Sequence, residues 1–92
     1  MYVILVYDIK SDEDGQGVLN RTFKTCKKYL SHIQNSVFEG ELAESQIIKL
    51  KYELDGIIRK DKDSVILFKS RNKRWLNKDM WGKNEDRTSN FI

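Results

Sequence analysis

The sequence lacks the features that mark secreted, membrane-spanning or zinc-binding proteins. Its single cysteine, Cys26, excludes an internal disulfide, and its longest uninterrupted apolar run, from Tyr2 to Tyr7, is far too short to cross a bilayer. The single histidine, His32, has no cysteine or second histidine at ligand spacing, so no zinc site is predicted. Because no charged and then apolar leader is present, we expect a cytoplasmic protein without a membrane partner.

Two further absences narrow the possible functions. No GxxxxGKS, GxxxxGKT or GxGxxG pattern occurs, so a nucleotide cofactor is not expected. We interpret the segment from Ser11 to Gly17 as a loop. Its acidic stretch from Asp12 to Asp14 lacks the glycine and terminal glutamate of a calcium-binding loop, and we interpret it as a solvated turn. The formal net charge of +3 permits a nucleic-acid partner without requiring one.

The length and composition predict one domain with a thin core. A chain of 92 residues buries only about 60 to 70% of its unfolded surface on folding. Hydrophobic residues make up 39% and charged residues 34%, which is typical of a globular protein. Two Trp, four Tyr and four Phe leave aromatic surface that a second subunit would cover. We therefore expect a homodimer.

Two segments have the uniform apolar pattern of strands buried on both faces. The first runs from Tyr2 to Tyr7 and ends at Asp8, and the second runs from Ser64 to Phe68. Between them, the segment from His32 to Leu42 is extended in character and broken at Gly40, so it is either one bent strand or two short ones. A further strand is possible between Trp75 and Trp81, which gives a domain over residues 1–82 and a polar tail over residues 83–92.

Two amphipathic helices are predicted by apolar residues that recur at steps of three and four. The first runs from Val18 to Ser31, and its apolar stripe consists of Leu19, Phe23, Cys26 and Leu30. The second runs from Ala43 to Ile57, and its apolar stripe consists of Ala43, Ile47, Leu50, Leu54 and Ile57. Because it lies on such a stripe, Cys26 is expected to be a buried thiol and not a nucleophile. His32 is expected to be structural or solvent-facing.

The element order predicts a ferredoxin-like α+β sandwich of βαββαβ topology. Two helices cover only one face of an antiparallel sheet, yet the strands ending at Tyr7 and Phe68 are apolar on both faces. The second face must therefore pack against a surface that excludes water, and sheet-on-sheet dimerisation would satisfy this requirement.

Asp8 is the carboxylate that the sequence places at the end of a buried strand, where a scaffold holds a functional group rigidly. Magnesium usually takes one or two carboxylates and completes its octahedron with water and phosphate. Two copies of Asp8 on a two-fold axis would form a competent Mg²⁺ site that could support phosphodiester hydrolysis. The alternative is that Asp8 is a turn-forming cap after the strand.

Two clusters of basic residues are candidates for nucleic-acid binding. No acidic residue falls between Val18 and Asn35, so the basic side of the first helix has no local charge partner. The first cluster is Arg21, Lys24 and Lys28, and the second, beside Trp75, is Arg71, Lys73 and Arg74. Either could contact phosphates. The alternative is an ordinary solvated surface, and Trp75 and Trp81 could instead pack in the dimer.

Three segments resemble the CRISPR-associated Cas-two (Cas2) family: residues 2–9 (YVILVYDI), 27–42 (KKYLSHIQNSVFEGEL) and 63–68 (DSVILF). The resemblance covers roughly residues 1–70, and its most specific part runs from Gln34 to Gly40. It implies a ferredoxin-like homodimer whose C-terminal extra strand pairs with the partner, and an aspartate pair that binds Mg²⁺, to which Asp8 corresponds. It also implies endonuclease activity on RNA or DNA, with Tyr7, Ser36 and Phe38 shaping the site, and a role as the bridge between Cas integrase subunits during spacer acquisition.

The sequence departs from this family's pattern at two places. Many relatives carry an arginine pair soon after the first strand, where this chain has Asp14 to Gly17, and Arg21 is the nearest substitute. Ala43 replaces a hydroxyl residue that often caps the second helix, a loss of about 1 kcal/mol if nothing compensates. The alternative function is that of a non-catalytic nucleic-acid-binding or toxin-type RNA-acting domain outside CRISPR, since this fold hosts many functions.

Overall fold

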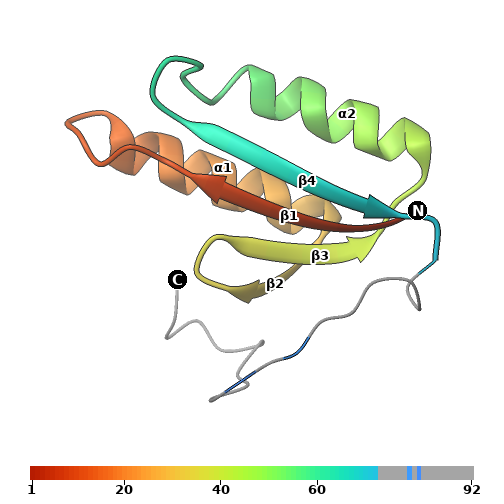
Figure 1. Ribbon diagram of the computed structural model, residues 1–92. Coiled ribbons are helices and arrows are strands. Elements are labelled where there is room, and N and C mark those ends of the chain that lie inside the picture. The colour runs from red at the N-terminus through yellow and green to blue at the C-terminus, as the bar shows by residue number, and fades with distance from the viewer. Residues whose placement is uncertain (73–78, 80, 82–92) are drawn as a thin grey trace.

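The computed structural model describes residues 1–72, 79 and 81 as a four-stranded antiparallel sheet with both helices on one side (Figure 1). The elements are β1 (Tyr2–Asp8), α1 (Gly15–Tyr29), β2 (Ser31–Gln34), β3 (Val37–Glu41), α2 (Glu44–Asp55) and β4 (Ser64–Ser70). The strand order is β2-β3-β1-β4. The predicted ferredoxin-like α+β fold is thereby confirmed. Apart from Asp79 and Trp81, the strand expected near Trp75 and the tail over residues 83–92 lie outside the described residues, as does the domain boundary after Gly82.

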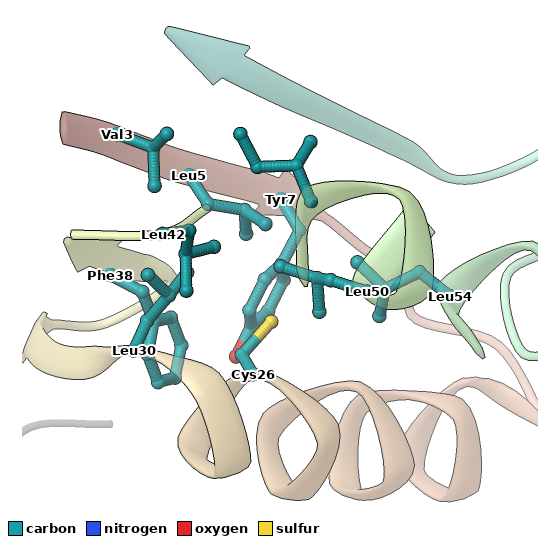
Figure 2. Packing of buried hydrophobic residues seen from close by; sticks show 10 residues of the cluster. Val3, Leu5, Tyr7, Cys26, Leu30, Phe38, Leu42, Leu50 and Leu54 are labelled. Atoms are coloured by element: carbon teal, nitrogen blue, oxygen red, sulfur yellow. The ribbon is translucent and has the colours of Figure 1, made fainter. Parts of the chain in front are cut away.

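The central position of β1 follows from its uniform apolar sequence. It pairs with β3 on one side and with β4 on the other, so both of its edges are hydrogen-bonded. Val3, Leu5 and Tyr7 point from this strand toward the helices (Figure 2) and are buried in the core. Burial of one such side chain contributes about 1.5–3 kcal/mol to folding. Within the part of the chain that the structure describes, neither helix is long and apolar enough to cross a bilayer.

Helix α1 begins three residues before the predicted start at Val18, because the glycines interpreted as loop belong to its first turn. Gly15 packs directly against the main chain that leaves β1. A Cβ atom at this position would lie 2.3 Å from the carbonyl oxygen of Lys10, so only glycine fits. The glycine therefore marks a close approach between α1 and the end of β1, and not a loop.

The extended segment after α1 forms two strands, and the chain turns at Asn35 and not at Gly40. Asn35 has a φ of 43°, the left-handed conformation that asparagine tolerates better than most residues. Gly40 instead lies within β3, where a Cβ atom would come within 3.0 Å of the Leu30 side chain. The sequence signal for the hairpin was therefore the asparagine.

Helix α2 compensates for the missing hydroxyl at its first cap position. The side-chain oxygen of Gln46 accepts a hydrogen bond of 2.8 Å from the backbone N–H of Ala43. This is the half of a capping box that does not need a hydroxyl side chain. The predicted stripe is buried at Ile47, Leu50 and Leu54, whereas Ala43 is exposed and Ile57 lies beyond the end of the helix.

Candidate metal and nucleic-acid site

The face of the sheet opposite the helices, here called the open face, is apolar and is not covered by either described helix. Side chains alternate along a strand, and the pairing of Ile4 with Phe68 and of Val6 with both Ile66 and Val37 places all five on this face. Ile66 and Phe68 are 52% and 53% exposed. The expectation that β1 and β4 are apolar on both faces is thus confirmed, and a half-exposed patch of this kind typically marks an interface.

Asp8 lies at the end of the open face. It is the last residue of β1, it pairs with Ser64 at the start of β4, and strand alternation puts its side chain on the same face as Val6. The residue is exposed, and within residues 1–72 its carboxylate makes no hydrogen bond or ion pair. An exposed carboxylate without a partner is available to a ligand.

A cleft of about 210 Å³ borders Asp8. Its walls consist of residues from the end of β1, from α1 and from the β2–β3 turn: Tyr7, Asp8, Ile9, Leu19, Asn35 and Ser36. The Ser36 carbonyl accepts a 3.2 Å hydrogen bond from the Tyr7 backbone N–H, and this bond holds the turn against the end of β1. The structure therefore brings Ser36 next to Asp8.

The side chains of Tyr7 and Phe38 are buried in the core, and of the two only Tyr7 is among the residues that line this cleft. Phe38 is fully buried, with its ring centroid 6.0 Å from that of Tyr7, and the Tyr7 ring points toward Cys26 (Figure 2). Burial raises the pKa of the Tyr7 phenol to about 12. Tyr7 borders the cleft and Phe38 packs behind it in the core, and the expectation that both side chains shape the site stays a prediction.

His32 and Cys26 are structural residues. The His32 ring is buried against Phe23 and Phe38, and its Nε2 is 2.7 Å from the Asn35 carbonyl oxygen, so the ring helps to hold the β2–β3 turn. Cys26 is fully buried, which raises the pKa of its thiol to about 12. At that pKa the thiol is protonated at neutral pH and is not a nucleophile.

The predicted basic surface on α1 is only partly available. Arg21 and Lys24 are exposed, but Lys28 forms an ion pair of 2.5 Å with Glu53 of α2. The sequence shows no acidic neighbour of Lys28 within α1, because its partner Glu53 comes from the second helix. Arg71 is exposed, whereas Lys73 and Arg74 lie outside the described residues.

A partly buried ion-pair cluster next to the end of β1 was missed by the sequence analysis. The Arg59 guanidinium contacts both Asp12 and Asp63, and the Asp63 side chain is 0% exposed. The interpretation of the acidic stretch as a solvated turn was wrong for Asp12, which is ion-paired with Arg59 and Lys62. The polar link at residues 59–63 was a usable signal, since an arginine and an aspartate four residues apart can pair.

The fit of Mg²⁺ to these residues depends on a second copy of the chain. No group of three or more metal-ligating side chains occurs among the residues that the structure describes. Asp8 supplies one carboxylate per chain that is unpaired within residues 1–72, and Mg²⁺ is usually bound by one or two carboxylates and keeps several waters. The donors present therefore suit Mg²⁺ when two Asp8 side chains share it.

A larger hollow of about 380 Å³ lies between α2 and β4, on the other side of the sheet. Its lining is mainly aliphatic, with Leu50, Leu54 and Leu67 at its base and Lys51 and Asp55 among the polar residues. Lys51 and Asp55 form an ion pair with each other.

Comparison with known proteins connects this geometry with one family. Residues 1–78 match the family model described as "CRISPR associated protein Cas2". The chain is 58% identical over 92 residues to the "CRISPR-associated endoribonuclease Cas2" of Fusobacterium nucleatum, covering 100% of this chain and 87% of that protein. It is 44% identical over 91 residues to "CRISPR-associated endoribonuclease Cas2 2" of Moorella thermoacetica, covering 98% of this chain and 100% of that protein.

Solved structures show the same similarity in three dimensions. A crystal structure titled "cas2" matches with a TM-score of 0.80 and 36% identity, over 100% of this chain and 98% of that chain. The crystal structure of Streptococcus pyogenes Cas2 at pH 6.5 matches with a TM-score of 0.73 and 28% identity, over 87% of this chain and 100% of that chain.

Proposed function

The chain belongs to the CRISPR-associated Cas2 family, and we propose that it is a homodimeric, Mg²⁺-dependent endonuclease of the spacer-acquisition machinery. The observation that carries this proposal is the position of Asp8, an exposed carboxylate without a hydrogen bond or ion pair within residues 1–72, at the end of an apolar sheet face that neither described helix covers. In the proposed dimer the two-fold axis passes beside Asp8, so that the two copies of the carboxylate meet across the contact.

The apolar patch on the open face supports the dimer. Burying a fully exposed large apolar side chain contributes about 1.5–3 kcal/mol. Because Ile66 and Phe68 are each about half exposed, burying both in two chains contributes about 3–6 kcal/mol toward association. This gain opposes the loss of translational and rotational freedom on association.

The two Asp8 carboxylates would hold the cation in this dimer. When bound, Mg²⁺ would lower the pKa of a coordinated water and neutralise charge on the phosphate. Without a cation, two carboxylates that face each other repel. Cation binding is therefore coupled to dimerisation, and added Mg²⁺ strengthens the dimer.

The substrate is a nucleic-acid phosphodiester, and RNA is the first to test because the relatives from F. nucleatum and M. thermoacetica are named endoribonucleases. The cleft beside Asp8 has room for part of a strand, with Asn35 and Ser36 as its hydrogen-bonding side chains. Double-stranded DNA is the second substrate to compare.

A second role, as a bridge between Cas integrase subunits on DNA, is favoured by the exposed basic side chains of α1. Arg21 and Lys24 are one turn apart and carry no ion pair within the described residues. They can neutralise phosphates without using Asp8. This role and cleavage therefore depend on different residues.

The experiment that separates these roles is the Asp8→Asn variant. We expect it to lose Mg²⁺-dependent cleavage of RNA while its dimer and its metal-free affinity for nucleic acid are retained. Asp61→Asn is the matched control, because Asp61 is exposed, makes no hydrogen bond or ion pair within residues 1–72, and loses the same charge. Cleavage by Asp8→Asn at the wild-type rate, with the same products, would refute the catalytic proposal and leave the bridging role in place.

A further inference from the structure

The ion-pair cluster of Arg59, Asp12 and Asp63 lies directly behind the end of β1 that carries Asp8. Arg59 Nε and Nη2 each donate a 3.0 Å hydrogen bond to the Asp63 carboxylate, and Nη1 donates one of 2.6 Å to Asp12. The cluster is well shielded, with side-chain exposures of 18% for Arg59 and 0% for Asp63. Shielded, charge-assisted pairs with two parallel hydrogen bonds hold a fixed geometry.

The cluster also holds the main chain just after Asp8. Asp63 accepts a 2.9 Å hydrogen bond from the backbone N–H of Lys10, two residues after Asp8. Arg59 Nη2 donates a 3.0 Å hydrogen bond to the carbonyl oxygen of the same residue. Lys10 therefore has both of its backbone polar groups tied to the cluster.

Asp63 also fixes the start of β4, the strand whose first residue pairs with Asp8. Asp8 pairs with Ser64, and Ser64 directly follows Asp63. Asp63 also accepts a 2.8 Å hydrogen bond from the backbone N–H of Arg59, which ties the start of β4 to the preceding loop. One buried carboxylate thus joins the chain leaving β1 to the chain entering β4, next to the rung that carries Asp8.

We propose that Asp63 and Arg59 are positioning residues that set the place and direction of the Asp8 carboxylate and thereby the affinity of the paired site for Mg²⁺. This inference rests on the proposed function, because it requires that Asp8 bind the cation. Mg²⁺ demands near-ideal octahedral geometry, so small displacements of a ligand reduce affinity. Asp8 has no side-chain partner of its own within the described residues, so its position depends on the main chain.

The test is Mg²⁺ binding to the full-length Asp63→Asn variant, measured by titration calorimetry with MgCl₂ and repeated with MnCl₂. We expect affinity to fall about 10–100-fold, the usual effect of removing a partner that orients a metal ligand. The backbone amide of Lys10 should lose protection from hydrogen exchange, and metal-free affinity for a single-stranded RNA should stay unchanged. Asp55→Asn is the matched control, since it removes one charge and one ion pair on α2 and should bind Mg²⁺ like the wild type.

A milder variant keeps the inference testable if Asp63→Asn does not fold. Asp12→Asn removes one of the Arg59 contacts but leaves the Asp63 hydrogen bonds to Lys10 in place. We expect it to weaken Mg²⁺ binding about 3–10-fold.

Two results would overturn the inference, and they differ in what else they remove. If the folded variants lose only thermal stability and bind Mg²⁺ like the wild type, the cluster is merely structural and the proposed function stands. If the wild-type dimer itself binds no Mg²⁺, the metal-dependent function and the positioning role both fail.

Discussion

A charge placed on the open face should separate the dimer without unfolding the chain, and Ile66→Glu is the most direct way to place it. Ile66 lies at the middle of β4, pairs with Val6 and is 52% exposed in the single chain. Because the side chain is half exposed in the monomer, a glutamate at this position remains solvated there. In the dimer the same carboxylate would be buried against an apolar surface.

The size of the effect follows from burial on both sides of a two-fold contact. The effective cost of burying an unpaired carboxylate is several kcal/mol, and a symmetric contact buries two. Even about 4 kcal/mol in total weakens the dimer roughly 1,000-fold, since each 1.4 kcal/mol is a factor of ten. A dimer of micromolar dissociation constant would become millimolar and would be monomeric in ordinary assays.

Sedimentation velocity over a range of protein concentrations measures this change, with circular dichroism to show that the fold is retained. The control is Ile48→Glu, the same substitution at an exposed isoleucine of α2 on the other side of the sheet. We expect Ile48→Glu to remain dimeric. A folded Ile66→Glu chain that dimerises as well as the wild type would refute the assignment of the open face as the interface.

Three further predictions follow from the local structure. Gly15→Ala should destabilise the fold by about 1–3 kcal/mol in denaturant unfolding, because its Cβ would collide with the Lys10 carbonyl oxygen. The control Gly17→Ala, whose Cβ would lie 3.6 Å from the Arg21 side chain, should be neutral or stabilising by up to about 1 kcal/mol. Equal effects at the two positions would contradict the close approach of Gly15 to Lys10. Changing Arg21 and Lys24 together to alanine should flatten the plot of log affinity for duplex DNA against log salt by roughly 1–2, and an unchanged slope would remove this face from the interface. Arg59 lowers the pKa of Asp63 in the folded chain, so the ion pair stabilises the fold fully above the ordinary aspartate pKa of about 3.9, and this stabilisation is lost as pH falls toward the lowered pKa of Asp63. The free energy of unfolding of Asp63→Asn should lack this dependence on acid pH. An identical pH dependence of unfolding in both proteins would count against the ion pair.

Patterns with strong periodicity predicted most of the fold. The uniform apolar strand at β1 and the two apolar stripes that became α1 and α2 were identified from residue type and spacing, because burial on one or both faces leaves a direct imprint on sequence. Local chemistry was harder to interpret. Gly15 and Asn35 were assigned to the wrong kind of structure or overlooked, because a glycine at a close approach and one in a loop look alike in sequence.

Only part of the candidate site could be predicted from local patterns in the sequence. Asp8 was identified because it ends a buried strand, and Ser36 came from the resemblance to a family and lies beside it. The pairing of Lys28 with Glu53 and that of Arg59 with Asp12 could not be found from local spacing, because these partners are 25 and 47 residues apart in the chain. Long-range contacts of this kind depend on how the helices and loops pack against the sheet.

The central claim is that two Asp8 carboxylates share one cation across the open face, and the stoichiometry of Mg²⁺ binding tests it most directly. Calorimetric titration of the wild-type dimer should give one Mg²⁺ for every two chains, and binding should disappear in both Asp8→Asn and the monomeric Ile66→Glu. One Mg²⁺ for every chain, or undiminished binding by the monomer, would contradict the shared site.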